Sequence, residues 1–221
     1  MTEGDTYLTL AAPAEGAYRE KGSRFLAFAA PVRTEGEAKE CLERLRKEYY
    51  DARHHCYAYV LGPAGAQYRA NDAGEPNHSA GDPILGQIRS RGLTDVIVVV
   101  VRYFGGTKLG VSGLINAYRT AAAAALDAAR VVQKTVRVGL SLHFVYPATN
   151  AVMKVVKEYD LDVTHQTFHT DCHLEVWVRR AHADEVTRKF GQAEVTVAQI
   201  KGDGRPEEGR PETGDRRPEE A

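Results

Sequence analysis

The chain has 221 residues, 43% of them hydrophobic, which is enough to build one or two packed domains. The formal net charge is −1, so the total charge does not indicate a nucleic-acid-binding protein. The three cysteines are widely spaced and odd in number, which argues against a disulfide framework and against a CxxC zinc site. The chain opens without a charged and apolar leader, and no apolar run approaches the roughly 20 residues of a membrane span. We therefore expect a cytoplasmic protein with no membrane partner.

The first part of the chain alternates short strand patterns with one helical pattern. Residues 1–23 are polar, with a short strand expected at 7–10. Apolar spacing then predicts the following elements: a strand at 23–32, a helix at 37–50, and a hairpin with strands at 56–61 and 67–70. The next thirteen residues, NDAGEPNHSAGDP at 71–83, are dense in Gly, Pro, Asp and Asn. A long loop of this composition within a compact domain more often than not contributes to function. A short helix is expected at 84–91.

The centre of the chain is a strand, a glycine-rich loop and an alanine-rich helix. Val96–Val101 are six apolar residues in a row, which predicts a strand covered on both faces. Gly105 and Gly106 allow a sharp turn, and Ser112 is the expected N-cap of the following helix. The loop 105–113 matches neither GxxxxGK[ST] nor GxGxxG, so we expect no nucleotide cofactor and no other cofactor.

The last part of the chain predicts a second domain. Strands are expected at 135–144, 161–168, 172–178 and 194–200, with helices at 147–159 and 181–190. The order β-α-β-β-α-β is that of a ferredoxin-like unit. We therefore expect domains at 1–133 and 134–201. Residues 202–221 repeat GRPEE-like segments without an anchoring apolar residue, which predicts a disordered tail.

A basic bias marks the central stretch. Between residues 84 and 130 there are six Arg or Lys against two Asp. Arg102, Lys108 and Arg119 are the expected phosphate contacts, with Arg53 and His54 as weaker candidates. The aromatic residues nearby are Tyr57, Tyr59, Tyr103 and Phe104. Basic groups interleaved with aromatic rings suit single-stranded or loop RNA, although alternate aromatics also serve simply to fill a core.

Two other functions remain open on the residues alone. A hydrolase would use Asp72 and Glu75 with His54 or Cys56, and it predicts that these side chains meet in one cleft. Turn and cap roles are commoner for such acidic residues, and Cys56 begins an apolar run typical of a buried small side chain. A protein-interaction module would instead present an exposed apolar patch. His165, His169 and His173 lack metal-ligand spacing, so no metal or catalytic residue is assigned.

Four blocks of the sequence resemble the IMPACT/YigZ family. They are SRFLAFAAPV, ARHHCYAYVLG, NDAGEPNHSAGDPIL and VVVVRYFGGTKLGVSGLINAYR, and the match runs from about residue 18 to residue 130. The family pattern fits the following loop residues: Asp72, Gly74, Glu75, Pro76, Ala80, Gly81, Pro83, Gly105, Gly106 and Gly110. Family members usually carry Ser-Gly-Thr where this chain has Asn77, His78 and Ser79.

The resemblance implies an α+β protein. Its N-terminal domain is expected to be ribosomal protein S5 domain 2-like, and its C-terminal ferredoxin-like domain to be similar to domain V of elongation factor G. Eukaryotic relatives regulate translation by binding the ribosome-associated activator of an initiation-factor kinase, and no catalytic set is established for the family. The resemblance therefore favours a non-catalytic, translation-associated protein whose partner is RNA or the ribosome, with a protein partner as the alternative.

Overall fold

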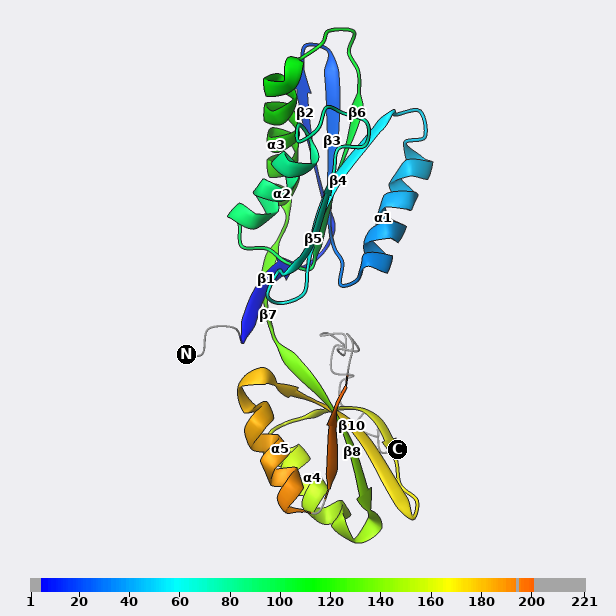
Figure 1. Ribbon diagram of the computed structural model, residues 1–221, viewed down its shortest axis with the longest axis vertical. Coiled ribbons are helices and arrows are strands. Elements are labelled where there is room, and N and C mark those ends of the chain that lie inside the picture. Colours follow the sequence, from blue (N-terminus) through cyan, green and yellow to red (C-terminus); the bar gives the residue numbers. More distant parts are fainter. Residues whose placement is uncertain (1–4, 194, 201–221) are drawn as a thin grey trace, which may run out of the picture. The chain divides into compact units, whose positions relative to one another are not determined.

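The computed structural model describes residues 5–193 and 195–200, and it divides into two compact units between Val136 and Arg137 (Figure 1). No helix within the described ranges is long and apolar enough to cross a membrane. The elements of the first unit are β1 Thr6–Leu10, β2 Ala14–Glu20, β3 Ser23–Pro31, α1 Glu35–Glu48, β4 His54–Leu61, β5 Gln67–Asn71, α2 Gly81–Ser90, β6 Val96–Tyr103, α3 Gly110–Ala128 and β7 Val131–Thr135.

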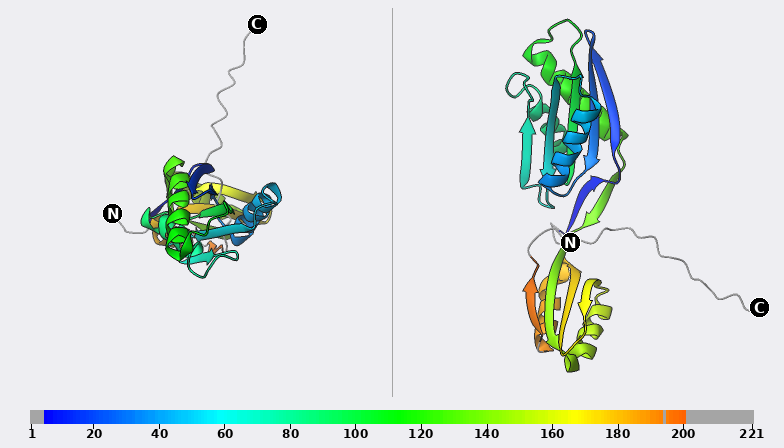
Figure 2. Two further views of the ribbon diagram at one scale, coloured as in Figure 1. Left: turned by 90° about the horizontal axis from the view of Figure 1, so that it is seen from above. Right: turned by 90° about the vertical axis from the view of Figure 1, so that its right-hand side faces the viewer.

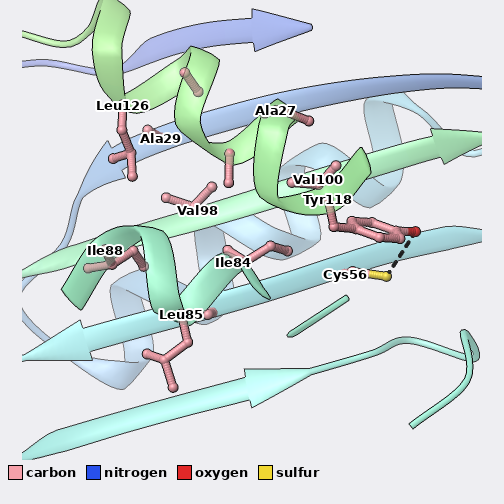
Figure 3. Packing of buried hydrophobic residues seen from close by; sticks show 14 of the residues in the cluster. Ala27, Ala29, Cys56, Ile84, Leu85, Ile88, Val98, Val100, Tyr118 and Leu126 are labelled. Carbon is pink, nitrogen blue, oxygen red and sulfur yellow. Dashed lines mark hydrogen bonds between the residues drawn. The ribbon is translucent and has the colours of Figure 1, made fainter. Parts of the chain in front are cut away.

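The first unit is built on an antiparallel sheet with strand order β2-β3-β6-β4-β5. Helices α2 and α3 lie against one face and α1 against the other, so that α1 is in front of the sheet in the right-hand view of Figure 2. Along Val96–Val101 the even-numbered side chains pack under α2 and α3, and the odd-numbered ones pack under α1. All six are fully buried, which confirms the prediction of a strand covered on both faces. Figure 3 shows the packing under α2 and α3.

Two details of this unit differ from expectation. Strand β2 lies in a region for which no strand was predicted, because its sequence AEGAYRE is polar and none of its residues is fully buried. It holds its place through Gly16, where a Cβ would lie 2.3 Å from the backbone nitrogen of Ala125 in α3. Helix α3 begins at Gly110, and its N-cap is Leu109 rather than Ser112, without a side-chain capping bond.

The second unit has the predicted β-α-β-β-α-β order. Its elements are β8 Arg137–Val145, α4 Thr149–Glu158, β9 Asp162–Thr167, β10 Asp171–Arg179, α5 Ala183–Gln192 and β11 Thr196–Gln199. The antiparallel sheet has strand order β11-β8-β10-β9, and its core includes apolar side chains of α4 and α5. The strand expected at 135–144 is β8 at 137–145, and it is preceded by an unexpected strand, β7, which pairs with β1 in the first unit. The predicted tail at 202–221 lies outside the described residues.

Candidate functional site

A buried polar network joins the end of β6 to the loop before α2. Arg102 Nη1 lies 2.6 Å from Glu75 Oε1, and only 6% and 4% of the two side chains are exposed. Tyr118 of α3 donates its hydroxyl to the same carboxylate oxygen at 2.7 Å. The Cys56 thiol in turn donates to the Tyr118 oxygen at 3.3 Å (Figure 3). Because these hydrogen bonds link side chains of β4, β6 and α3 to Glu75, the network ties three elements and the loop together.

The loop between β5 and α2 is organised by Asp72. Its carboxylate accepts from the backbone N–H groups of His78, Ala80 and Gly81 at 2.8 to 2.9 Å. Burial raises the pKa of this carboxyl, but the three N–H groups outweigh burial, and the pKa is lowered. His54 Nδ1 lies 3.0 Å from the carbonyl oxygen of Ala73, which ties the loop to the start of β4. These hydrogen bonds of Asp72 and His54 therefore fix the conformation of the loop and hold it next to β4.

A cavity of about 440 Å³ opens where β4 starts and β6 ends. Its lining residues are Asp51, Ala52, Arg53, His54, Arg102, Tyr103 and Phe104. The two strands meet there because His54 pairs in register with Arg102. The Tyr103 hydroxyl donates to Asp51 at 2.7 Å, and this bond, with burial second, raises the pKa of Tyr103 to about 12. The cavity thus combines two guanidinium groups and an imidazole with two aromatic rings and one carboxylate.

The glycine-rich loop after β6 is set by close backbone packing. A Cβ on Gly105 would lie 1.9 Å from the carbonyl carbon of Gly22, in the turn between β2 and β3. Gly106 and Gly110 have φ of +86° and +72°, a region that side chains disfavour. The loop residues Phe104 and Lys108 are consequently presented on the surface by a tightly constrained backbone.

Known proteins resemble this chain along most of its length. The Impact N-terminal domain model matches residues 21–126. IMPACT family member YigZ of Escherichia coli strain K12 is 32% identical over 188 residues, which are 84% of this chain and 92% of that protein. The chain belongs to the IMPACT family. IMPACT family member YvyE of Bacillus subtilis strain 168 is 40% identical over 129 residues, 58% of this chain and 59% of that protein.

A solved structure extends the likeness of this IMPACT-family chain to both units. It is a crystal structure described as that of a hypothetical protein, and it matches with a TM-score of 0.71 at 30% identity. The match covers 90% of this chain and 99% of the other. The predicted family membership and the predicted α+β fold are therefore confirmed.

Some basic residues of the first unit are buried and others are exposed. Arg102 was expected to contact a polyanion from the surface, but it is buried and paired with Glu75, because β6 carries it inward under Phe25 and Phe104. Arg91 pairs with Asp127 at 2.6 Å. Other cations of the central stretch, Lys108 and Arg119, are exposed, as is Arg53 in the turn before β4.

The hydrolase hypothesis predicted that Asp72, Glu75 and His54 would meet. Within the described residues none of the three side chains bonds to another, since each is held by a different partner. Cys56 is fully buried, and burial raises the pKa of its thiol to about 12, which leaves it protonated and a poor nucleophile at neutral pH. In this arrangement Asp72, Glu75, His54 and Cys56 serve to hold the structure together.

Sequence reasoning found some residues of the cavity and missed others. Arg53, His54 and Arg102 were expected near phosphates, and Tyr103 and Phe104 were noted as aromatic neighbours. Nothing in the sequence indicated that Asp51 lines the cavity, because its contact with Tyr103 depends on the pairing of β4 with β6.

Two histidines of the second unit stack on each other. The rings of His143 and His173 lie with centroids 4.4 Å apart at 19° between their planes. No cluster of three His, Cys, Asp or Glu side chains in the part of the chain that the structure describes is arranged to hold a metal ion.

Proposed function

We propose that this IMPACT-family protein is a cytoplasmic, non-catalytic, translation-associated factor that binds RNA or the ribosome through its first unit. The observation that carries the proposal is the gathering of Arg53, His54 and Phe104 around one cavity at the end of β6. Lys108 lies in the loop that follows. Cationic groups beside exposed aromatic rings suit RNA, because phosphates pair with the cations and unstacked bases pack on the rings.

The family resemblance supports the same direction, since eukaryotic IMPACT proteins act in the regulation of translation. The likeness of the two domains to parts of elongation factor G also fits a ribosomal partner. Fold analogy alone does not establish a function, so the weight rests on the chemistry of the site.

The exposed cations outside the cavity supply the general attraction for RNA. Lys108 and Arg119 have no ion-pair partner within residues 5–193 and 195–200, so their charges are available to phosphates. Each phosphate contact releases counterions, and each lost contact lowers the salt slope of single-strand binding by about 0.7. Binding by this surface should therefore weaken steeply as salt rises.

Ribosome co-sedimentation tests the proposal. Lys108→Ala combined with Arg119→Ala should reduce the fraction that sediments with ribosomes, and the difference in affinity from the wild type should be largest near 50 mM salt and shrink toward about 200 mM. The matched control is Lys39→Ala with Lys47→Ala, two exposed lysines of α1 on the other face of the sheet. If the Lys108/Arg119 variant sediments like the wild type while both remain folded, the proposal is wrong.

A further inference from the structure

We propose that the cavity between β4 and β6 binds the phosphorylated terminal nucleotide of an RNA. The inference rests on the proposed function and names the ligand chemistry at one site within it. The cavity volume of about 440 Å³ is in the range of sites for small ligands, about 300 to 1,000 Å³, and it suits a mononucleotide.

The phosphate end of this site is defined by Arg102. Its side chain is 6% exposed, lines the cavity, and donates from Nη1 to Glu75. Its Nε is buried and has no hydrogen-bond partner among the described residues. A buried guanidinium donor without an acceptor is unfavourable, so a shift of the Arg102 side chain that brings Nε to an anionic ligand oxygen in the cavity would satisfy it.

Two further basic side chains line the same cavity. Arg53 is exposed at its edge, where the forked guanidinium group suits two phosphate oxygens at once. The Nδ1–H of His54 donates to the carbonyl oxygen of Ala73, so Nε2 is an acceptor in the neutral ring and donates to a phosphate oxygen only when the ring is protonated. Glu75 offsets the charge of Arg102, which leaves Arg53 as the unpaired guanidinium group at the cavity.

The remaining lining residues suit the nucleoside. Phe104 is 58% exposed; the Arg102 guanidinium carbon lies 5.7 Å from its ring centroid, and the exposed part of the ring offers a surface for an unstacked base. Asp51 adds a carboxylate that accepts from ribose hydroxyls and repels a second phosphate. A terminal nucleotide meets both requirements, because its base is free to leave the stack and its phosphate carries more charge than an internal one.

The test uses the full chain and one eight-nucleotide RNA in three forms: with a 5′-phosphate, with a 3′-phosphate, and with hydroxyls at both ends. Fluorescence anisotropy measures the affinity for each form, and calorimetry measures binding of adenosine monophosphate and of inorganic phosphate. We expect one phosphorylated end to bind at least about 10-fold more tightly than the hydroxyl form. Comparison of the two phosphorylated forms and the free mononucleotide identifies which source of the phosphate the cavity accepts.

Substitutions show whether the cavity is responsible for the preference for a phosphorylated RNA end. Arg53→Gln and Phe104→Ala change exposed side chains and should reduce the advantage of the phosphorylated end to less than about 2-fold, whereas the matched exposed controls Arg188→Gln and Phe168→Ala should retain it. The Lys108/Arg119 double variant should weaken binding of all three RNAs alike and preserve their ratio.

Equal wild-type affinity for all three RNAs overturns the inference, and so does an advantage that survives in both cavity variants. In either case, loss of binding in the Lys108/Arg119 variant still supports the proposed function. If the wild type binds none of the three RNAs, the assignment of the cavity to an RNA terminus fails, and the ribosome co-sedimentation experiment decides the proposed function separately.

Discussion

Removal of the Arg102 charge is expected to destabilise the first unit strongly. Arg102→Met keeps much of the apolar stem but leaves Glu75, 4% exposed, with the Tyr118 hydroxyl as its partner. Breaking a buried pair by removing one member costs about 3–5 kcal/mol, because the other charge remains buried without compensation. We therefore expect the free energy of unfolding to fall by about that amount.

Urea unfolding followed by far-UV circular dichroism measures the loss. The single tryptophan, Trp177, lies in the second unit, so its fluorescence follows that unit separately. The matched control is Arg91→Met, because the Arg91–Asp127 pair is much more exposed and should contribute less than about 1 kcal/mol. Arg102→Met combined with Glu75→Leu should recover much of the stability, since no charge is then left unpaired. A loss below about 1 kcal/mol in Arg102→Met would refute the buried pair.

Three further predictions follow from particular groups. Gly105→Ala should lower the free energy of unfolding by about 1–3 kcal/mol or more through overpacking, while Gly86→Ala, with open space around a helical position, should be neutral or stabilising; equal melting temperatures would contradict this. The rise of the Cys56 pKa from 9.0 to about 12 lowers its thiolate fraction at pH 8 by about 1,000-fold, so native alkylation at Cys56 should be far slower than in urea, and stability should fall as pH rises from 9 toward 12. The lowered pKa of Asp72 stabilises the fold above its ordinary value of 3.8 and loses this effect as pH falls below it, so Asp72→Asn should flatten acid unfolding between about pH 4 and 2.

Elements could be predicted from the sequence where their own residues form a clear hydrophobic pattern. Val96–Val101 could be assigned to a doubly covered strand because a run of six apolar residues has no polar face to expose. Strand β2 could not be assigned, because its stability comes from pairing with β3 and from the contact of Gly16 with α3, neither of which appears in its own composition. The N-cap at Ser112 was wrong for a related reason, since the helix begins earlier, directly after the constrained glycine loop.

The same distinction applies to the candidate site. Residue type alone suggested that Arg102, Lys108 and Arg119 share one role. The sequence separation of Glu75 and Arg102 hid their pairing, which exists only because the loop after β5 folds back over the end of β6. Once Arg102 has a buried carboxylate partner, the exposed cations and the buried one must be assigned different functions.

The motif RYFGGTKLG combines two physical tasks in nine residues. Arg102 is buried and pairs with Glu75 of the β5–α2 loop, and Gly105 packs against the backbone of Gly22 in the β2–β3 turn. Phe104 and Lys108 face outward from the same constrained backbone. The Phe104 ring and the Lys108 charge lie on a rigid loop, so they lose little conformational entropy when a ligand binds. By making the loop rigid, Arg102 and Gly105 therefore increase the contribution of these two side chains to affinity. On this argument Arg102→Met should weaken RNA binding even where the variant remains folded, while the affinity of the Arg102→Met/Glu75→Leu variant should show how much of that loss is due to the missing guanidinium itself.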